Sequence, residues 1–293
     1  MALIGFIGLG HMGTPMCKNL VEKGHRVKAF DLDHNKLQEA VKNGAEIGKS
    51  ALEVAKGADF ILSMLPEGKH VRSVYLGENG LLGKLQGTEF ILECSTIDVE
   101  TSRELSSQAH TFGHNIVDAP VSGGVGGATA ATLTFMVGGS EAEFIKAQDI
   151  LTCLGKHLFH CGPHGNGQLT KICNNMMLAV HMIVTSEAFV LAEKLGLSPE
   201  KLFEVASVSS GQSWSLTAYA PVPDVVPSSP ANRGYKAGFS AGMMNKDLGL
   251  AMKSAEMANL TLSMGKKAKE VYQTFCDEGQ SELDFSGIIK SIK

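Results

Sequence analysis

The first half of the chain alternates short apolar runs with stretches of helical hydrophobic spacing. The apolar runs are too short for helices, and we expect them to form strands at 3–7, 27–30, 59–63, 90–94, 115–118 and 133–137. Between them the spacing predicts helices at 12–22, 34–43, 50–56, 67–75, 98–112 and 141–153. Alternation of this kind favours a mostly parallel sheet with helices on both faces.

Beyond about residue 165 the strand pattern disappears and helical patterns dominate. Residues 167–194 are apolar nearly all round, which predicts a long buried helix that ends at Gly196. At 1.5 Å per residue such a helix would be about 42 Å long. Four prolines in 220–235 indicate a long loop. Further helices are expected at 199–207, 213–219, 243–258, 262–279 and 286–291.

A glycine pattern follows the first predicted strand and identifies what the first half binds. Gly8-x-Gly10-x-x-Gly13 leads into a helix, and Asp31 closes the next strand 18 residues after Gly13. Strand, glycine turn, helix, strand and acid in this order are typical of a dinucleotide-binding domain, in which the pyrophosphate lies at the helix N-terminus. Asp31 would accept hydrogen bonds from a ribose and repel a 2′-phosphate, so NAD is favoured over NADP. Asp33, a rival for this role, is better interpreted as a helix N-cap.

These patterns together predict the fold class and the domains. We expect an α/β Rossmann-type N-terminal domain with a mostly parallel sheet, residues 1–164. An all-α C-terminal domain, residues 165–293, would follow, joined to it by the long helix and serving substrate binding and oligomerisation.

Composition excludes several classes of protein. The chain has 293 residues, of which 44% are hydrophobic and 19% charged, and its net charge is −4. Without a basic stripe, nucleic acid is not an expected partner, and without an uninterrupted apolar run of ~18 residues neither is a membrane. Six cysteines without a CxxC pair suggest reduced thiols in the cytoplasm. No metal is expected: His157, His160 and His164 lie close together in sequence, but a polar loop explains them better than zinc.

Candidate chemistry is concentrated in the segment 162–175, where a glycine-rich turn runs into the long helix. Lys171 and Asn175 are four residues apart, so they share one face of that helix. Partial desolvation would lower the pKa of the lysine towards a useful range. The amide one turn away could hold the lysine or a substrate hydroxyl, which suggests a pair for proton transfer.

Other candidates lie after the strands of the first half, where parallel sheets bind their ligands. Met64 and Leu65 follow one strand and could contact the cofactor through apolar surface, and Thr96 follows the next and could offer its hydroxyl. Asp98 is equally well explained as a helix cap.

Three further segments have two readings each. Ser122, Gly123 and Gly124 offer a hydroxyl and backbone N–H groups that could cradle a carboxylate, or they form a mobile loop. Lys246, beside Asp247, could reach a ribose or a carboxylate, or it forms a surface ion pair. Trp214 could wall an active site or belong to a core.

Four segments in order, 5–13, 118–124, 165–175 and 246–248, together resemble the β-hydroxyacid dehydrogenase family. The resemblance extends over essentially the whole chain. It implies hydride transfer between NAD and a small β-hydroxy acid. The segments 209–215, 221–223 and 238–239 are most similar to the branch of the family that oxidises 3-hydroxyisobutyrate in valine breakdown.

The resemblance also implies residue roles. Lys171 would be the catalytic acid/base. The substrate would be bound by Ser122, Gly123, Gly124 and Asn175, with Trp214 and Phe239 as walls suited to a methyl group. NAD would be bound by Gly8, Gly10, His11, Met12, Gly13, Asp31, Met64, Leu65, Thr96 and Lys246.

Two alternatives remain open at this stage. A related enzyme that reduces tartronate semialdehyde would need a more polar pocket. A non-catalytic dinucleotide-binding scaffold would be expected to lack the lysine, which this chain has. The long helix suggests packing between subunits, so a homodimer or homotetramer is expected.

Overall fold

The computed structural model describes residues 1–292. It divides into two compact units, Met1–Lys171 and the part from Ile172 onward. The predicted domain boundary at 164/165 stays a prediction. Each unit is described by itself below.

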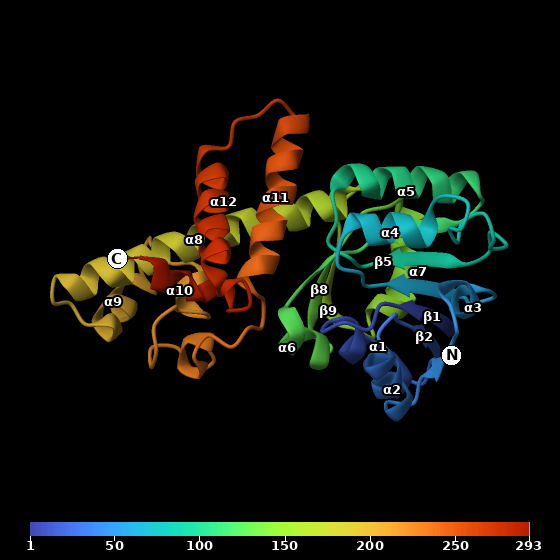
Figure 1. The fold of residues 1–293 in the computed structure, drawn as a ribbon, viewed down its shortest axis with the longest axis horizontal. Coiled ribbons are helices and arrows are strands. Elements are labelled where there is room, and N and C mark those ends of the chain that lie inside the picture. The colour runs from blue at the N-terminus through green and yellow to red at the C-terminus, as the bar shows by residue number, and fades with distance from the viewer. Residues whose placement is uncertain (293) are drawn as a thin grey trace. The chain divides into compact units, whose positions relative to one another are not determined.

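The first unit is built on a parallel sheet (Figure 1). Its strand order in the described chain is β3-β2-β1-β4-β5-β6, and each neighbouring pair is parallel. The order reverses between β1 and β4, and a ligand-binding crevice forms at such a point in this fold. The Rossmann-type fold predicted for this half is thereby confirmed. The strands are β1 (Leu3–Ile7), β2 (Arg26–Phe30), β3 (Glu46–Ile47), β4 (Phe60–Ser63), β5 (Phe90–Glu93) and β6 (Asn115–Asp118).

Helices cover both faces of this sheet because apolar side chains alternate along its strands. In β4, Phe60 and Leu62 pack into one core and Ile61 into the other. The first core lies under α1 (Gly13–Glu22), α2 (His34–Lys42) and α7 (Glu141–Leu151). The second lies under α3 (Ala51–Ala55), α4 (Gly68–Tyr75) and α5 (Val99–Thr111).

A second, smaller sheet contains the strand predicted at 133–137, which therefore does not extend the parallel sheet. β8 (Leu133–Val137) pairs antiparallel with β7 (Val121–Ser122) and parallel with β9 (Gly155–His160). Between β7 and β8, the glycine-rich stretch forms the short helix α6 (Gly124–Thr129), not a loop. Its Ala128 packs into the first core, which explains why this stretch is ordered.

The second unit is helical, as predicted. The helix α8 (Asn166–Lys194) begins in the first unit and continues into the second. Its Ala179 and Met182 pack with α11 (Ala241–Met257) and α12 (Ser263–Phe275), which lie side by side (Figure 1). The remaining helical elements are α9 (Pro199–Ala206), α10 (Trp214–Thr217), η1 (Pro230–Arg233), the π-helical turn η2 (Cys276–Gln280) and η3 (Phe285–Ser291).

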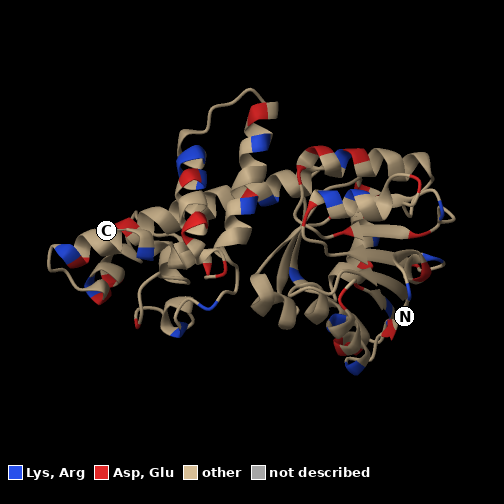
Figure 2. Ribbon diagram, in the orientation of Figure 1, with Lys and Arg blue, Asp and Glu red and all other residues tan. Residues whose placement is uncertain are grey.

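The helix α8 is unusually apolar. It is long and hydrophobic enough to cross a membrane by length and composition, with a mean hydropathy of 1.5 over 18 residues. Only a third of that window is buried, so the prediction of a buried helix is wrong for most of α8. The middle of α8 carries almost no charge, whereas acidic and basic side chains intermingle on α11 and α12 (Figure 2). A core helix of a soluble protein passes the same test, so we assign no membrane span.

Candidate active site

The turn between β1 and α1 has the shape that a dinucleotide requires. At Gly8 the backbone has φ +96°, and a Cβ there would lie 2.3 Å from the backbone oxygen of Met64. A Cβ on Gly13 would lie 1.9 Å from the Gly8 oxygen, so no side chain fits there. A Cβ on Gly10, by contrast, would meet nothing within 4 Å. The turn is thus closed on its inner side and open at Gly10, where a pyrophosphate can approach the backbone.

The neighbours of these glycines also fit a cofactor site. His11 is exposed on the turn, and Met12 is partly buried against the first core. The carboxylate of Asp31 accepts a hydrogen bond from the Leu9 N–H at 2.6 Å, so it lies against the glycine turn while remaining partly exposed. Asp33 accepts from the Asn35 N–H at 2.8 Å and caps α2, which confirms its interpretation as an N-cap.

The ends of β4 and β5 lie beside this turn. A Cβ on Gly8 would be 3.0 Å from the Leu65 side chain, which places Met64 and Leu65 against the glycine turn. Leu65 donates its N–H to Ser95 Oγ at 2.7 Å. Thr96 follows Ser95 and is partly exposed. Asp98 accepts from the Thr101 N–H and caps α5.

The start of α8 is fixed to these strand ends through Gln168. Its Nε2 donates to the Ser95 carbonyl at 2.7 Å and its Oε1 accepts from the Ile97 N–H at 3.0 Å, on either side of Thr96. Gln168 is completely buried. One side chain thereby links the first turn of α8 to the loop that follows β5.

Asp118, at the end of β6, holds the backbone of the same turn. Its two oxygens accept from the N–H groups of Gly165 and Gln168 at 2.7 and 2.9 Å. Burial raises the pKa of Asp118, although these two bonds oppose the shift. A Cβ on Gly167 would lie 2.3 Å from the Met136 oxygen, so glycine is required for α8 to approach the sheets this closely.

Lys171 lies one helical turn beyond Gln168 and is 8% exposed. Asn175 follows one turn later on α8 and is 2% exposed. Its Nδ2 donates to Asp247 Oδ2 at 2.6 Å, which orients the amide. The lysine and the amide are therefore both sheltered from water, and their chemical role stays a prediction.

Asp247 and Lys246 form an ion pair in which the carboxylate is buried and the lysine side chain is 27% exposed. The Lys246 ammonium lies 3.4 Å from Asp247 Oδ1, and Asp247 is 3% exposed. The pair is therefore half-buried, and the role of Lys246 stays a prediction.

Ser122 ends the two-residue strand β7, opposite Thr134 of β8. Gly123 has φ +133° and Gly124, with φ +59°, opens α6. The first N–H groups of a helix have no partner within it, so they are available to an acceptor. The geometry is compatible with the predicted carboxylate cradle, which stays a prediction.

Trp214 and Phe239 are joined by a chain of aromatic rings in the second unit. Trp214 stacks on Tyr219 at 4.8 Å, Tyr219 stacks on Phe285 at 5.3 Å, and Phe239 meets Phe285 edge-on at 5.7 Å. Trp214 is 53% exposed, so it does not belong to a core. Asp284 accepts from the Tyr219 hydroxyl and from the Gly238 N–H, both at 3.0 Å, and fixes this chain of rings.

Sequence reasoning gave no role to Gln168, Asp118 or Asp247. Their partners are far away in sequence, for example 50 residues between Asp118 and Gln168. The sequence points to these three residues only because they lie in the segments 118–124, 165–175 and 246–248 that carry the family resemblance. Glu93 was also missed: it is a buried carboxylate at the end of β5 that accepts from Ser63 Oγ and from the Ser95 N–H.

Comparison with known families covers almost the whole chain. A model of the NAD-binding domain of 6-phosphogluconate dehydrogenase matches residues 3–162. A model described as NAD-binding of NADP-dependent 3-hydroxyisobutyrate dehydrogenase matches residues 165–292.

Individual relatives agree with these families. The chain is 46% identical to 3-hydroxyisobutyrate dehydrogenase of Pseudomonas aeruginosa, covering 99% of this chain and 98% of that one. It is 43% identical to the NAD-dependent L-serine dehydrogenase of the same organism, covering 99% and 97%. The solved structure of Mycobacterium tuberculosis 3-hydroxyisobutyrate dehydrogenase with L-serine is similar with a TM-score of 0.93 and 42% identity, covering 100% and 99%.

Proposed function

Since the chain belongs to the β-hydroxyacid dehydrogenase family and is an NAD-dependent dehydrogenase, we propose that its substrate is 3-hydroxyisobutyrate, oxidised to methylmalonate semialdehyde. The observation that carries this proposal is the buried Lys171, one turn before an Asn175 whose amide is held by Asp247. We also propose that residues 1–164 bind the cofactor and 165–293 serve substrate binding and oligomerisation.

Lys171 is the acid/base of the proposed reaction. In its neutral form its Nζ takes the proton of the substrate hydroxyl while the adjacent carbon gives up its hydride, and a C=O bond replaces C–OH. NAD, when bound, supplies the hydride acceptor. In the reverse direction the protonated Lys171 returns the proton to the carbonyl oxygen. Asn175 holds the lysine and the reacting oxygen in line.

Two groups of residues would select the substrate. Ser122, Gly123 and Gly124 bind its carboxylate through one hydroxyl and backbone N–H groups. Trp214 and Phe239 contact its methyl group. Their fixed aromatic chain supports this assignment, because a rigid apolar wall favours a methyl over a polar substituent.

The cofactor site would use the glycine turn with His11 and Met12, the strand-end residues Met64, Leu65 and Thr96, and Lys246. Asp31 accepts from the ribose and disfavours the 2′-phosphate of NADP. The carboxylate is partly exposed beside Leu9, which leaves it able to act in this way.

The test is NADH or NADPH formation at alkaline pH from (S)-3-hydroxyisobutyrate, glycerate and L-serine in parallel. A clear preference for hydroxyisobutyrate with NAD is expected. A preference for glycerate would move the enzyme to the tartronate semialdehyde reductases, and inactivity on all three would indicate a non-catalytic scaffold.

L-serine is the second candidate substrate, because one relative acts on it and one similar structure contains it. Serine differs from hydroxyisobutyrate in carrying an ammonium in place of a methyl. Trp214→Ala separates the two: the variant should lose turnover on hydroxyisobutyrate more than on serine if the wall contacts the methyl group.

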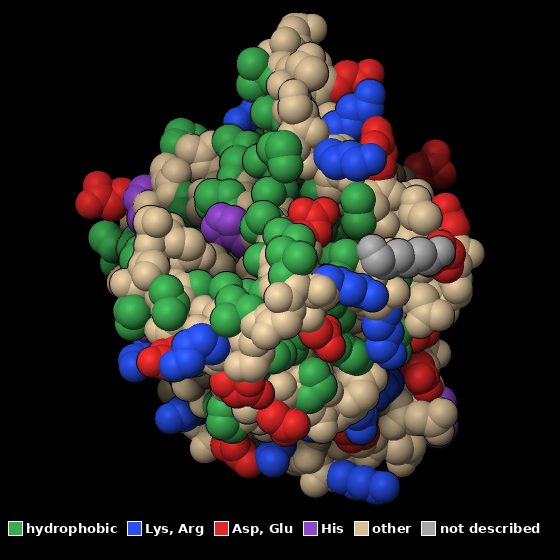
Figure 3. Space-filling view, turned by 90° about the vertical axis from the view of Figure 1, so that its left-hand side faces the viewer, with side chains coloured by type: hydrophobic (Ala, Val, Ile, Leu, Met, Phe, Trp, Pro, Cys, Tyr) green, Lys and Arg blue, Asp and Glu red, His purple; other side chains and the backbone are tan. Residues whose placement is uncertain are grey.

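A homodimer or homotetramer is proposed from the exposed apolar stripe of α8. Met177, Val184 and Leu191 recur every seven residues and are 52, 53 and 62% exposed. Figure 3 shows apolar side chains gathered on the face that it presents. Light scattering should give a multiple of the chain mass of 31.1 kDa, and Val184→Glu should lower it. Partition into vesicles would instead indicate a membrane surface.

A cytoplasmic location, proposed from the unpaired cysteines, is testable by fractionation.

A further inference from the structure

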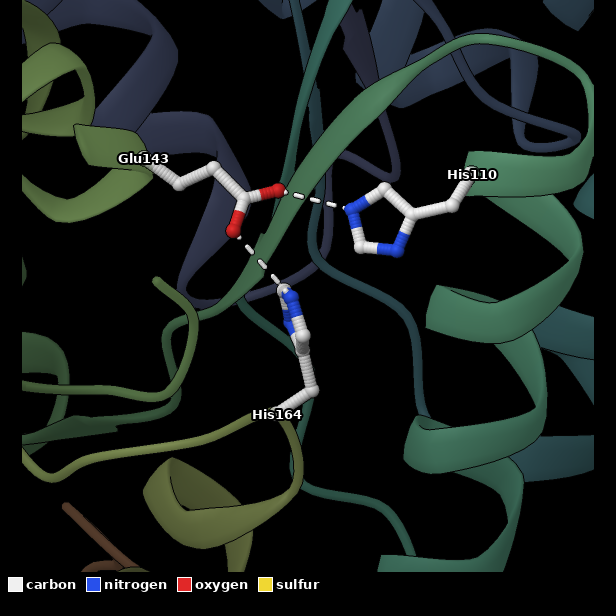
Figure 4. A group of neighbouring side chains, drawn as sticks. All are labelled: His110, Glu143 and His164. Carbon is white, nitrogen blue, oxygen red and sulfur yellow. Dashed lines mark hydrogen bonds and ion pairs between the residues drawn. The ribbon is translucent and has the colours of Figure 1, made fainter. Parts of the chain in front are cut away.

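Two histidines and a glutamate converge at a point of the first unit that the proposed reaction does not use. They are His110 in the last turn of α5, Glu143 in the first turn of α7, and His164 in the loop before α8 (Figure 4). In sequence they are 33 and 21 residues apart. Their ligand atoms all lie within 4.8 Å of one another. Among residues 1–292, no other three histidines, cysteines, aspartates or glutamates lie together with this spacing.

Both imidazole rings present the same nitrogen to one carboxylate. His110 Nε2 is 2.9 Å from Glu143 Oε1, and His164 Nε2 is 3.1 Å from Oε2. Two ligand atoms bound to one zinc ion at ~2.0–2.2 Å with angles of 90–109° are themselves about 2.8–3.6 Å apart. The rings meet edge-on at 65° with centroids 5.0 Å apart, and both Nε2 atoms lie against the same carboxylate.

The carboxylate is held in place independently of the histidines. Glu143 Oε2 accepts from the backbone N–H and the hydroxyl of Ser140, at 2.8 and 2.6 Å, and Oε1 accepts from the Ile116 N–H at 3.2 Å. Outer partners of this kind orient the ligands of metal sites. The His110 side chain is 44% exposed, which gives an ion and a water molecule access from solvent.

We propose that His110, Glu143 and His164 bind a divalent transition metal ion of the zinc class. Two imidazoles and one carboxylate leave a fourth position for water, and imidazole ligands select zinc, cobalt or nickel over calcium or magnesium. The ion would replace the two bonds between histidine and carboxylate. It would connect the end of α5, the start of α7 and the loop that leads into α8. This site is separate from Lys171 and does not depend on the proposed substrate.

The structure corrects one sequence interpretation here. The sequence predicts a polar loop for His157, His160 and His164, but His157 and His160 lie on the strand β9. His164 instead lies with His110 and Glu143, whereas His157 stacks against Phe159 and His160 bonds to the Gly139 oxygen.

The test is isothermal titration of Zn²⁺ into the EDTA-treated full chain, at pH 7.5 in a buffer that does not bind metal. The wild type should bind one ion. His110→Ala and His164→Ala should each weaken zinc binding by about 100-fold or more. Loss of a residue that only hydrogen-bonds to a metal ligand already weakens metal binding by about 10- to 100-fold, and a lost ligand should cost at least as much. Glu143→Gln should do the same while keeping the helix cap, since Gln also serves at this position.

His157→Ala is the matched control and should leave binding unchanged. Equal zinc binding by the wild type and His110→Ala, or no binding by the wild type, would overturn the proposal. Zinc can also bind thiols such as the exposed Cys173. The Co²⁺ complex must therefore lack the strong near-ultraviolet absorption of a thiolate ligand, and its presence would equally overturn the assignment.

Discussion

Two glycine-rich turns lead from strands into helices in this chain, and they use glycine for opposite purposes. In the first, Gly10 has open space where a side chain would stand. In the second, Gly167 is in close contact with the backbone of Met136, and its missing side chain allows α8 to approach the sheets. The first turn leaves room for a ligand at Gly10, whereas the second uses glycine so that α8 can pack directly against the backbone of β8.

The carboxylates behind the two turns differ in the same way. Asp31 accepts the Leu9 N–H of the first turn and the Asp33 N–H just after β2, and it remains partly exposed. Asp118 accepts two N–H groups from the second turn and is 2% exposed. Both carboxylates thus accept two backbone N–H groups, and they differ in exposure: the partly exposed Asp31 can still accept from a cofactor hydroxyl, whereas the buried Asp118 can only position backbone. Binding and positioning are thus separate, and variants should affect one without the other.

Lys171→Ala should give the largest effect. If the second turn serves to place this lysine, turnover should fall by ~10²–10⁴-fold, the usual contribution of a positioned acid/base, with NAD affinity little changed. Steady-state kinetics and NAD titration measure the two quantities. Lys194→Ala, at the far end of the same helix, is the control. Near-normal turnover in Lys171→Ala would remove the proposed role.

Glu93→Gln tests a third carboxylate, at the end of β5. Burial raises the pKa of Glu93 to about 7 from an ordinary value of 4.5, although Ser63 and Ser95 oppose the shift. The folded state holds the carboxyl proton more tightly than the unfolded state does. The free energy of unfolding therefore has its full contribution from Glu93 below pH 4.5 and loses it as the pH rises from 4.5 through 7. At 1.36 kcal/mol per pKa unit, the wild type should lose about 3 kcal/mol relative to the variant between pH 5 and 8. Denaturant unfolding at several pH values measures this, and parallel pH profiles would contradict it.

Gly167→Ala and Gly10→Ala compare the two turns directly. The first adds a methyl against a backbone oxygen and should destabilise the fold by roughly 1–3 kcal/mol, as overpacking does, and slow turnover through a displaced α8. The second should leave the melting temperature nearly unchanged while weakening NAD binding. If both substitutions changed the melting temperature and the NAD affinity equally, the two turns would not differ in binding a ligand and positioning a helix.

Asp31→Asn should have the smallest effect. The amide oxygen can still accept the Leu9 N–H, but the bond from the Asp33 N–H to the other oxygen and the negative charge are both lost. The preference for NAD over NADP, measured as a ratio of kcat/KM values, should therefore fall roughly tenfold, as expected for a partly exposed charge. Asp33→Asn, which keeps the cap of α2, should not change the ratio. An unchanged ratio in Asp31→Asn would mean that another residue discriminates.

The elements that the sequence predicted are those with a buried, regular pattern. β1, β4, β5 and β6 are short apolar runs bounded by turns, and each was predicted within a residue or two. β9 was missed because most of its residues are exposed and it has no apolar run. α6 was missed because glycine is a poor helix former, and tertiary packing overrides that propensity here.

For the site, motif spacing located the glycine turn and the pair on α8, because those residues are neighbours in sequence. It could not identify Gln168 as the link to the β5 loop, because hydrogen bonds over 71 and 73 residues depend on the folded chain. The cluster of His110, Glu143 and His164 escaped detection for the same reason.

The amide of Gln168 uses one N–H and its oxygen in a single plane, as a peptide group does, and it occupies a peptide's place beside Ser95 and Ile97. The amide hydrogen of Ile97 is therefore shielded from exchange with solvent only while the first turn of α8 is in place. In a deuterium-exchange experiment that single amide reports fraying of a helix to which it does not belong. It offers a local signal for the seating of Lys171 that requires neither substrate nor cofactor.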